Sequence, residues 1–293
     1  MLFSVIIPTY NRAGWVGKTI ASVLGQNYAD FEVIVVDDGS TDNTTEVVEA
    51  LHHPALRYFK TQNRERGAAR NFGISKAVGD YVLFIDSDDI IYPHCLKVAF
   101  NFIEQNSNPE IFHVAHEIRD MDNNLVETTV HINDFNDVLI KGNPMACMNV
   151  FVRRDVANCF PFNENRLMAG FEDWELWLRL ASHYKIPQVK TVSGLMFNHD
   201  GRSSNNHTDK DKLILSIDVL MESVLSNNDI VDFYSGRLHL FKCSCYTYIA
   251  LHLAIAGKYK KQAVQYLFKG LGLRPAFVFE KRFAAIVKHL IVG

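Results

Sequence analysis

The chain has 293 residues, of which 48% are hydrophobic and 22% are charged. This length and composition predict an ordinary globular protein with one large α/β domain and an appendage. The charge-free stretch that starts at Cys243 is too short to span a bilayer, which excludes a membrane-crossing helix there. The five scattered cysteines are typical of reduced thiols, so we expect a cytoplasmic protein.

The net charge of −3 conceals a strong asymmetry along the chain. Residues 237–293 contain ten Lys or Arg and one acid, a net charge of +9, whereas residues 1–236 carry −12. A basic segment on an acidic body suggests an anionic partner, either a membrane or a nucleic acid. No nucleic-acid recognition motif accompanies it, so we expect no nucleic-acid partner. The basic helices either lie on a membrane surface or pack as a lid with solvated lysines.

Strands and helices are expected to alternate through the first part of the chain. Apolar runs predict strands over 3–8, 31–36, 56–59 and 81–85, with helices at 14–27, 41–51 and 67–78 between them. This alternation is typical of a doubly wound, mainly parallel sheet. Beyond it we expect a helix up to residue 105, a small antiparallel element within 111–132, a helix from residue 172, and helices from 212 onward.

Polar and aromatic side chains follow several of these strands. Asp86 and Asp88 come directly after a short buried strand, and Tyr10 and Asp38 follow two others. Ligands of open α/β sheets bind beyond the carboxyl ends of the strands. Two carboxylates there either cap the next helix or hold Mg²⁺ or Mn²⁺ against phosphate oxygens. Together with Arg70, they predict a nucleotide-diphosphate site that lacks a glycine-rich loop.

A second acidic motif, Glu172-Asp173-Trp174, opens a helix. Carboxylates in a first turn are favoured by the helix dipole, which is one explanation for it. The other is a general base, and adjacent helical residues diverge by about 100°, so only one of the two carboxylates can serve. Trp174 and Trp177 either pack in the core or line an acceptor site.

Three histidines call for separate interpretations. His113 and His116 are three apart on an expected strand, so we expect them to face opposite sides and to be structural. His199 belongs to a polar loop, 197–205, that could close over phosphates, and it is the histidine for which we favour a functional role.

Several spaced motifs occur together in order: SVIIPTYNR over 4–12, VVDDGSTD over 35–42, GAARNFG over 67–73, GDYVLFIDSDD over 79–89, and EDW over 172–174. This series resembles the family 2 glycosyltransferases of the GT-A fold, from residue 3 to about 205. The resemblance implies a GT-A domain over 1–207, with a nucleotide-binding half (1–105) and an acceptor-side half (106–207). A helical, basic extension over 208–293 would follow.

The resemblance also implies inverting transfer of a sugar from a nucleotide-diphosphate sugar to an acceptor hydroxyl. The donor-binding residues that it implies are Pro8, Tyr10, Arg12, Asp38, Arg70 and Asp86. Asp88 would be the direct ligand of Mn²⁺ or Mg²⁺, with Asp86 and His199 in support, and Asp173 would be the catalytic base.

We therefore expect a hexosyl- or N-acetylhexosaminyltransferase that uses a UDP-sugar. Its acceptor would be a lipid-linked or growing surface glycan at the inner face of a membrane. Two alternatives stay open at this point: a nucleotidyltransferase of similar sheet topology, and a non-catalytic nucleotide- or carbohydrate-binding module.

Overall fold

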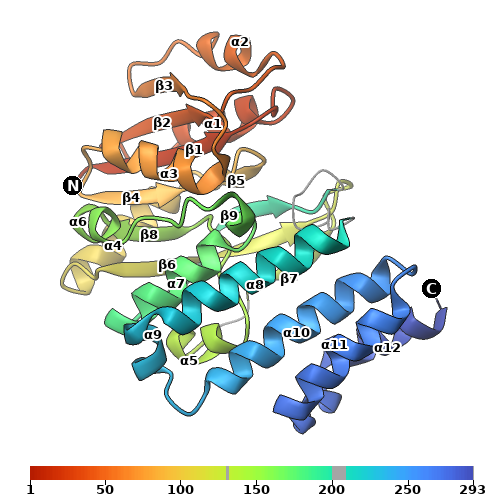
Figure 1. Ribbon diagram of the computed structural model, residues 1–293. Helices are drawn as coiled ribbons and strands as arrows, with labels where there is room; N and C mark the ends of the chain where they lie inside the picture. Colours follow the sequence, from red (N-terminus) through yellow and green to blue (C-terminus); the bar gives the residue numbers. More distant parts are fainter. Residues whose placement is uncertain (130–131, 200–208, 293) are drawn as a thin grey trace.

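A mixed sheet forms the centre of the computed structural model, which describes residues 1–129, 132–199 and 209–292 (Figure 1). Within these residues the strand order is β3-β2-β1-β4-β8-β6-β9-β5, and β7 pairs with β6. The strands are β1 (Phe3–Thr9), β2 (Phe31–Asp37), β3 (Leu56–Lys60), β4 (Tyr81–Phe84), β5 (Asp89–Ile91), β6 (Ile111–Arg119), β7 (Leu125–Thr128), β8 (Val150–Arg153) and β9 (Gln188–Phe197).

The first four strands are parallel, and antiparallel pairs enter the sheet beyond them. Val5 of β1 lies opposite Val33 of β2 and Leu83 of β4, so the carboxyl ends of these strands meet at one edge. Strand β8 then runs antiparallel to both β4 and β6, while β6 and β9 are parallel. The predicted fold class, a mainly parallel α/β sheet with an antiparallel element and C-terminal helices, is confirmed.

Helices cover both faces of the sheet because the strand residues alternate in direction. Val5 and Ile7 belong to a core formed with α1 (Val16–Leu24), α2 (Thr44–Glu49) and α4 (Cys95–Gln105). Ile6 points to the opposite core, formed with α3 (Glu65–Lys76), α6 (Arg154–Cys159) and α7 (Glu172–His183). Three short turns complete this second face: α5 (Phe135–Val138), η1 (Leu139–Lys141) and η2 (Arg166–Met168).

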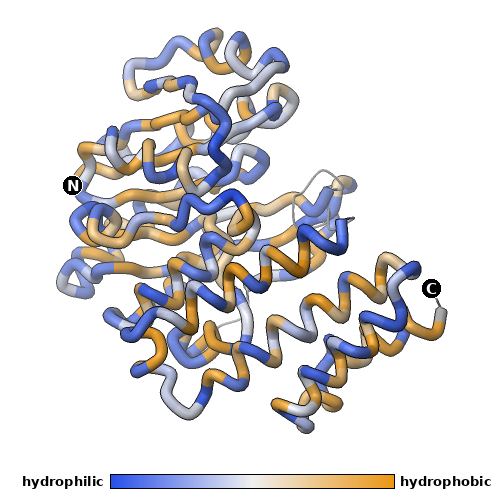
Figure 2. Tube along the Cα trace, in the orientation of Figure 1, coloured by the Kyte–Doolittle hydropathy of each residue, from blue (hydrophilic) through white to orange (hydrophobic). Residues whose placement is uncertain are grey.

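The C-terminal helices extend that second core. They are α8 (Lys210–Ser226), α9 (Asn228–Phe233), α10 (Leu238–Ile255), α11 (Lys260–Leu273), η4 (Pro275–Phe279) and α12 (Lys281–Val292). Phe241 of α10 packs edge-on against Trp174 of α7, with ring centroids 5.3 Å apart. Figure 2 shows apolar and polar positions interleaved along α10, α11 and α12. In the described parts of the chain, no helix has the length and apolar character needed to cross a bilayer.

The division of the chain after residue 207 stays a prediction, because 200–208 lie outside the described residues.

Other expectations can be compared with the structure directly. Trp174 and Trp177 are 5% and 0% exposed, so they pack in the core, and the acceptor-lining alternative is wrong. The expectation that His113 and His116 face opposite sides is also wrong. A register shift between Val114 and His116 brings their rings to 5.5 Å.

Candidate active site

A cavity of about 310 Å³ opens at the carboxyl ends of β1, β2 and β4. It is lined by Pro8, Thr9, Tyr10, Asn11, Arg12, Asp38, Asn63, Glu65, Arg66, Ala69, Asp86, Ser87 and Asp88. Six of the predicted site residues are among these: Pro8, Tyr10, Arg12, Asp38, Asp86 and Asp88. Arg70 and His199 do not line this cavity, but they contact Asp86 and Asp88, which do. Asp173 does not line it either, and its hydrogen bonds are to Trp174 and Asn143.

The loop after β1 presents its side chains through a backbone held in an unusual conformation. Asn11 has a φ of 51°, in the left-handed region. Two hydrogen bonds to the loop after β2 hold it there: its N–H donates to Ser40 Oγ at 2.9 Å, and its Oδ1 accepts from the Thr41 N–H at 2.8 Å. The preceding Tyr10 is 47% exposed at the cavity, which leaves its ring face open for stacking on a flat ligand.

Asp38 fastens the end of β2 to the start of α3. Its Oδ1 accepts the Arg64 N–H at 2.8 Å, and its Oδ2 accepts the Glu65 N–H at 2.9 Å. Burial nevertheless raises the pKa of Asp38 above its usual value, because these hydrogen bonds do not fully offset the loss of solvent. Each oxygen keeps a second lone pair, so the carboxylate can still accept a hydrogen bond from a ligand in the cavity.

Asp88 and His199 meet at the edge of the same cavity. His199 Nε2 lies 3.1 Å from Asp88 Oδ2, and the two side chains are 8% and 9% exposed. The imidazole is stacked on Trp15, with ring centroids 4.6 Å apart and planes inclined by 16°. Arg12 Nε lies 3.8 Å from the same carboxylate oxygen. The structure thus brings together two residues that are 111 positions apart and that sequence motifs alone associate only loosely.

Arg70 lies beneath the cavity and joins the two acidic motifs. Its side chain is 1% exposed. Nη2 donates to Asp86 Oδ1 at 2.7 Å, and Nη1 donates to Glu172 Oε1 at 2.6 Å. The other oxygen of Glu172 accepts the Gly170 N–H at 2.6 Å. The predicted contact between Arg70 and a nucleotide stays a prediction, and what the geometry provides is a buried link between Asp86 and the start of α7.

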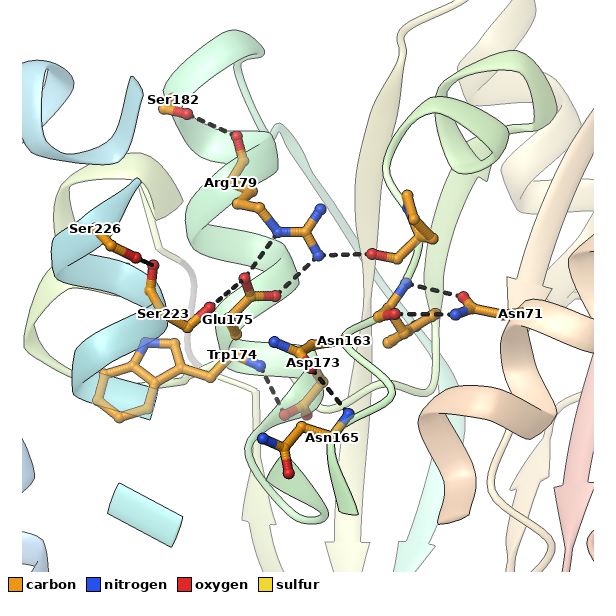
Figure 3. Close-up of polar contacts among 12 residues, drawn as sticks. Asn71, Asn163, Asn165, Asp173, Trp174, Glu175, Arg179, Ser182, Ser223 and Ser226 are labelled. Carbon is orange, nitrogen blue, oxygen red and sulfur yellow. Dashed lines mark hydrogen bonds and ion pairs between the residues drawn. The ribbon is translucent and has the colours of Figure 1, made fainter. Parts of the chain in front are cut away.

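Asp173 occupies the first turn of α7 and is partly exposed. Its Oδ1 accepts the Trp174 N–H at 2.7 Å (Figure 3), and its Oδ2 accepts from Asn143 Nδ2 at 3.1 Å. Desolvation, followed by the negative charge of Glu172, raises the pKa of Asp173 to about 7. A carboxylate with that pKa can exchange a proton near neutral pH, as a general base requires.

The third carboxylate of this turn has a structural role. Glu175 is bound by Arg179, with Nε–Oε1 and Nη2–Oε2 distances of 2.9 and 2.8 Å, and by Ser223 Oγ at 3.1 Å (Figure 3). These bonds fasten α7 to α8. The three acidic residues at the start of α7 therefore differ in role. Glu175 links α7 to α8, Glu172 pairs with Arg70, and Asp173 is a partly exposed carboxylate.

Sequence reasoning missed four residues of this site. Asn63, Glu65 and Arg66 line the cavity, and Asn143 holds Asp173. Glu65 has a φ of 73°, a left-handed conformation of the kind that is often found at functional sites. Arg66 stands four positions before Arg70 on the same helix, a spacing that could have suggested it. Nothing in the sequence distinguishes Asn143.

A mixed sheet of this order, with an acidic turn after β4 at the edge of a cavity and a second acidic motif opening a helix, defines the GT-A class of fold. The chain belongs to glycosyl transferase family 2, whose sequence model matches residues 4–153. The family that the motifs predicted is thereby confirmed.

The relatives and solved structures that resemble the chain agree with this class. A glycosyltransferase of Rickettsia felis is 35% identical over 190 residues, which cover 62% of this chain and 31% of the relative. The chain thus spans about a third of that protein. Residues 1–349 of TarS from S. aureus have the same fold, with a TM-score of 0.68 and 19% identity over 99% of this chain and 88% of that one. The mannosyltransferase PcManGT of Pyrobaculum calidifontis matches with a TM-score of 0.62 and 19% identity over 99% and 87%.

Proposed function

We propose that the protein is a metal-dependent, inverting glycosyltransferase that moves a hexose or N-acetylhexosamine from a UDP-sugar to an acceptor hydroxyl. The observation that carries this proposal is the connection between two features. The partly exposed Asp173, with its raised pKa, is next in sequence to Glu172, which is bound through buried Arg70 to Asp86 at the donor cavity. A base and a donor site held by one buried side chain favour group transfer over simple binding.

The donor half of the proposal rests on the cavity. Tyr10 and Asp38 suit a nucleobase, the ring by stacking and the carboxylate by accepting a base N–H. Arg12 and Arg66 also line the cavity, and their charges suit a diphosphate. TarS has been solved with UDP-GlcNAc, in a structure that shares this fold at 18% identity and a TM-score of 0.66. These features support UDP-GlcNAc as the first donor to test.

The residues present fit a divalent cation. Asp88 offers a carboxylate oxygen, a donor that suits Mg²⁺ or Mn²⁺, and the imidazole nitrogen of His199 lies 3.1 Å from it, so these two side chains would hold the cation. Among the described residues, no group of three or more His, Cys, Asp or Glu side chains is arranged for a metal. Mg²⁺ and related ions commonly take one or two protein ligands and complete their shell with phosphate oxygens and water. When bound, the cation would offset the charge that grows on the departing diphosphate.

Asp173 would accept the proton of the acceptor hydroxyl on the face of the sugar opposite the diphosphate. A single displacement of this kind inverts the configuration at C1, and the transition state resembles an oxocarbenium ion. General-base action of this kind is worth roughly 10²–10⁴ in rate. A mannosyltransferase with the same fold has been solved with GDP-Man and Mn²⁺, so a guanine donor is the alternative outcome of a donor screen.

Calorimetric titration of UDP-GlcNAc with and without Mn²⁺ tests the donor site. We expect metal-dependent binding by the wild type and by Asp173→Asn, and loss of the metal dependence in Asp88→Ala. UDP release in the presence of acceptor should fall at least a hundredfold in Asp173→Asn. Near-normal turnover of Asp173→Asn would contradict the base assignment. If calorimetry detected no binding of UDP-, GDP- or dTDP-sugars, a non-catalytic binding module would be favoured.

We also propose that the C-terminal helices attach the enzyme to an anionic membrane that carries its acceptor. The outward side of α12 presents Lys281, Lys288 and Ile291, and Phe279 just before it is 89% exposed. Lysines beside exposed apolar side chains suit a lipid surface. The wild type should sediment with vesicles that contain phosphatidylglycerol, and the double variant Lys281→Glu/Lys288→Glu should not. The matched control is Lys185→Glu/Lys190→Glu, and equal sedimentation of both double variants would contradict the proposal.

A further inference from the structure

A second cavity, of about 370 Å³, lies beneath the β6–β7 hairpin. The lining residues that matter here are His116, Ile118, Glu127, Asn143, Met145 and Met196. We propose that this cavity binds the sugar unit of the acceptor, and that Asn143 is a positioning residue shared by this cavity and the base Asp173. The inference rests on the proposed function and adds to it the place and chemical class of the acceptor.

Asn143 connects the cavity wall to the base. Its Nδ2 donates to Asp173 Oδ2 at 3.1 Å, and its Oδ1 accepts the Met145 N–H at 3.1 Å. The second hydrogen bond fixes which end of the amide faces Asp173, because only the –NH₂ end can donate to a carboxylate. A group bound in the second cavity and a group bound to Asp173 would therefore share one polar neighbour.

A series of contacts joins the proposed base to residues of both cavities. On one side Asp86 lines the donor cavity and is bound by Arg70, which is bound in turn to Glu172. On the other side Asp173, the next residue after Glu172, is bound to Asn143 in the wall of the second cavity. A displacement reaction needs the attacking hydroxyl between the base and C1 of the donor sugar, so an acceptor unit bound in the second cavity would extend its hydroxyl past Asp173 toward the donor cavity.

The chemistry of the lining suits a hydroxyl-bearing ring. Ile118, Met145 and Met196 supply apolar surface for the C–H face of a pyranose, and Met side chains adapt to irregular shapes. His116, Glu127 and Asn143 can pair with hydroxyl groups. The volume falls within the range of about 300–1,000 Å³ that is usual for small-molecule sites.

Filling the cavity tests the proposal. UDP release from UDP-GlcNAc is measured with a panel of methyl glycosides of glucose, galactose, mannose and N-acetylglucosamine as probe acceptors. We expect at least one glycoside to accelerate release by the wild type. Met196→Trp and, independently, Ile118→Trp should raise its KM at least tenfold. Val126→Trp is the matched control: it lies on the same hairpin, is 56% exposed, does not line the cavity, and should leave the KM unchanged.

Changing Asn143 tests its positioning role. A donor N–H favours the ionised form of a carboxylate. Asn143→Ala should therefore shift the acid limb of the kcat–pH profile upward and lower kcat about tenfold at neutral pH. The other titratable groups around Asp173 are Glu172 on α7, Arg70 on α3, Asp86 after β4, Cys147 before β8 and Tyr248 on α10. Asn143→Ala leaves all of them in place.

The outcomes separate this inference from the proposed function. UDP binding, measured on every variant, reports whether the variant is folded and has a donor site. Absence of UDP-sugar binding in the wild type would overturn the proposed function itself. Binding without acceleration by any glycoside, or acceleration that both tryptophan variants leave intact, would overturn the acceptor cavity alone. An unmoved acid limb in Asn143→Ala would overturn the positioning role.

Discussion

The buried contact between Arg70 and Glu172 gives the sharpest prediction. Glu172→Gln keeps the shape of the side chain but removes its charge. Both partners are almost fully buried, at 1% and 3% exposure, and the oxygen–nitrogen distance is 2.6 Å. Breaking a buried pair by removing one partner costs about 3–5 kcal/mol, and here Arg70 keeps its second ion pair, with Asp86 at 2.7 Å, which favours the lower end of that range. Gln still accepts a hydrogen bond, so we expect a loss of about 3 kcal/mol in the free energy of unfolding, measured with urea.

The same substitution should change the pH dependence of transfer. The charge of Glu172 disfavours ionisation of Asp173, so it holds the pKa of Asp173 up. In Glu172→Gln that repulsion is gone, and the negative charge of Glu172 no longer offsets the effect of the positive charge of Arg70 on Asp173. The pKa of Asp173 should fall, and the acid limb of the kcat profile should move to lower pH. The plateau rate should also fall, because a carboxylate of lower pKa is a weaker base.

Glu175→Gln is a matched control on the same helix. Glu175 is also buried and paired with an arginine, Arg179, with 4% and 16% side-chain exposure. This variant should lose stability as well, but its acid limb should coincide with that of the wild type. A loss below about 1 kcal/mol in Glu172→Gln, the size of an exposed ion pair, would refute the energetic reasoning. An acid limb that moves equally in both variants would refute the electrostatic reasoning.

Three further outcomes are expected. In the wild type, transfer should rise as pH increases through about 7, because the base acts as a carboxylate, and a rate that is flat from pH 5 to 8 would contradict this. His199→Ala should raise the Mn²⁺ concentration that gives half-maximal UDP release about tenfold or more. An unchanged concentration would remove His199 from the metal site. Asp38→Asn keeps one acceptor oxygen but loses the charge, and it should weaken UDP binding in calorimetry. It should also lower the thermal midpoint of unfolding, because the wild-type carboxylate accepts two backbone N–H groups at the start of α3.

The fold and the donor cavity were largely predictable from the sequence. Short continuous apolar runs such as 3–8 and 81–85 are typical of strands buried between two layers of helices, and parallel strands place their carboxyl ends at one edge. The residues after those ends, including Tyr10, Asp38 and Asp88, therefore line one cavity. Local sequence and a general rule of topology were sufficient for these positions.

The contacts across the chain were not predictable in the same way. Asn143 reaches Asp173 over 30 positions, and a register shift in β6 turns His116 toward the side of His113. Neither a β-bulge nor a loop-to-helix hydrogen bond has a periodic signature in sequence. The burial of Trp174 and Trp177 was also not predictable. Their helical spacing fitted both core packing and an acceptor site, and the helix that covers Trp174, α10, comes from a region without sequence motifs.

Arg70 explains why the two acidic motifs occur together. A carboxylate of ordinary pKa is ionised at neutral pH but is a poor base, and one raised too far is protonated and cannot act. Glu172 raises the pKa of Asp173, and Arg70 limits that rise while holding Glu172 in place. Because Arg70 also binds Asp86, any ligand that displaces Asp86 must alter the charge balance at the base. In the mechanism that we propose, the same buried guanidinium therefore sets both the geometry of donor binding and the strength of the base.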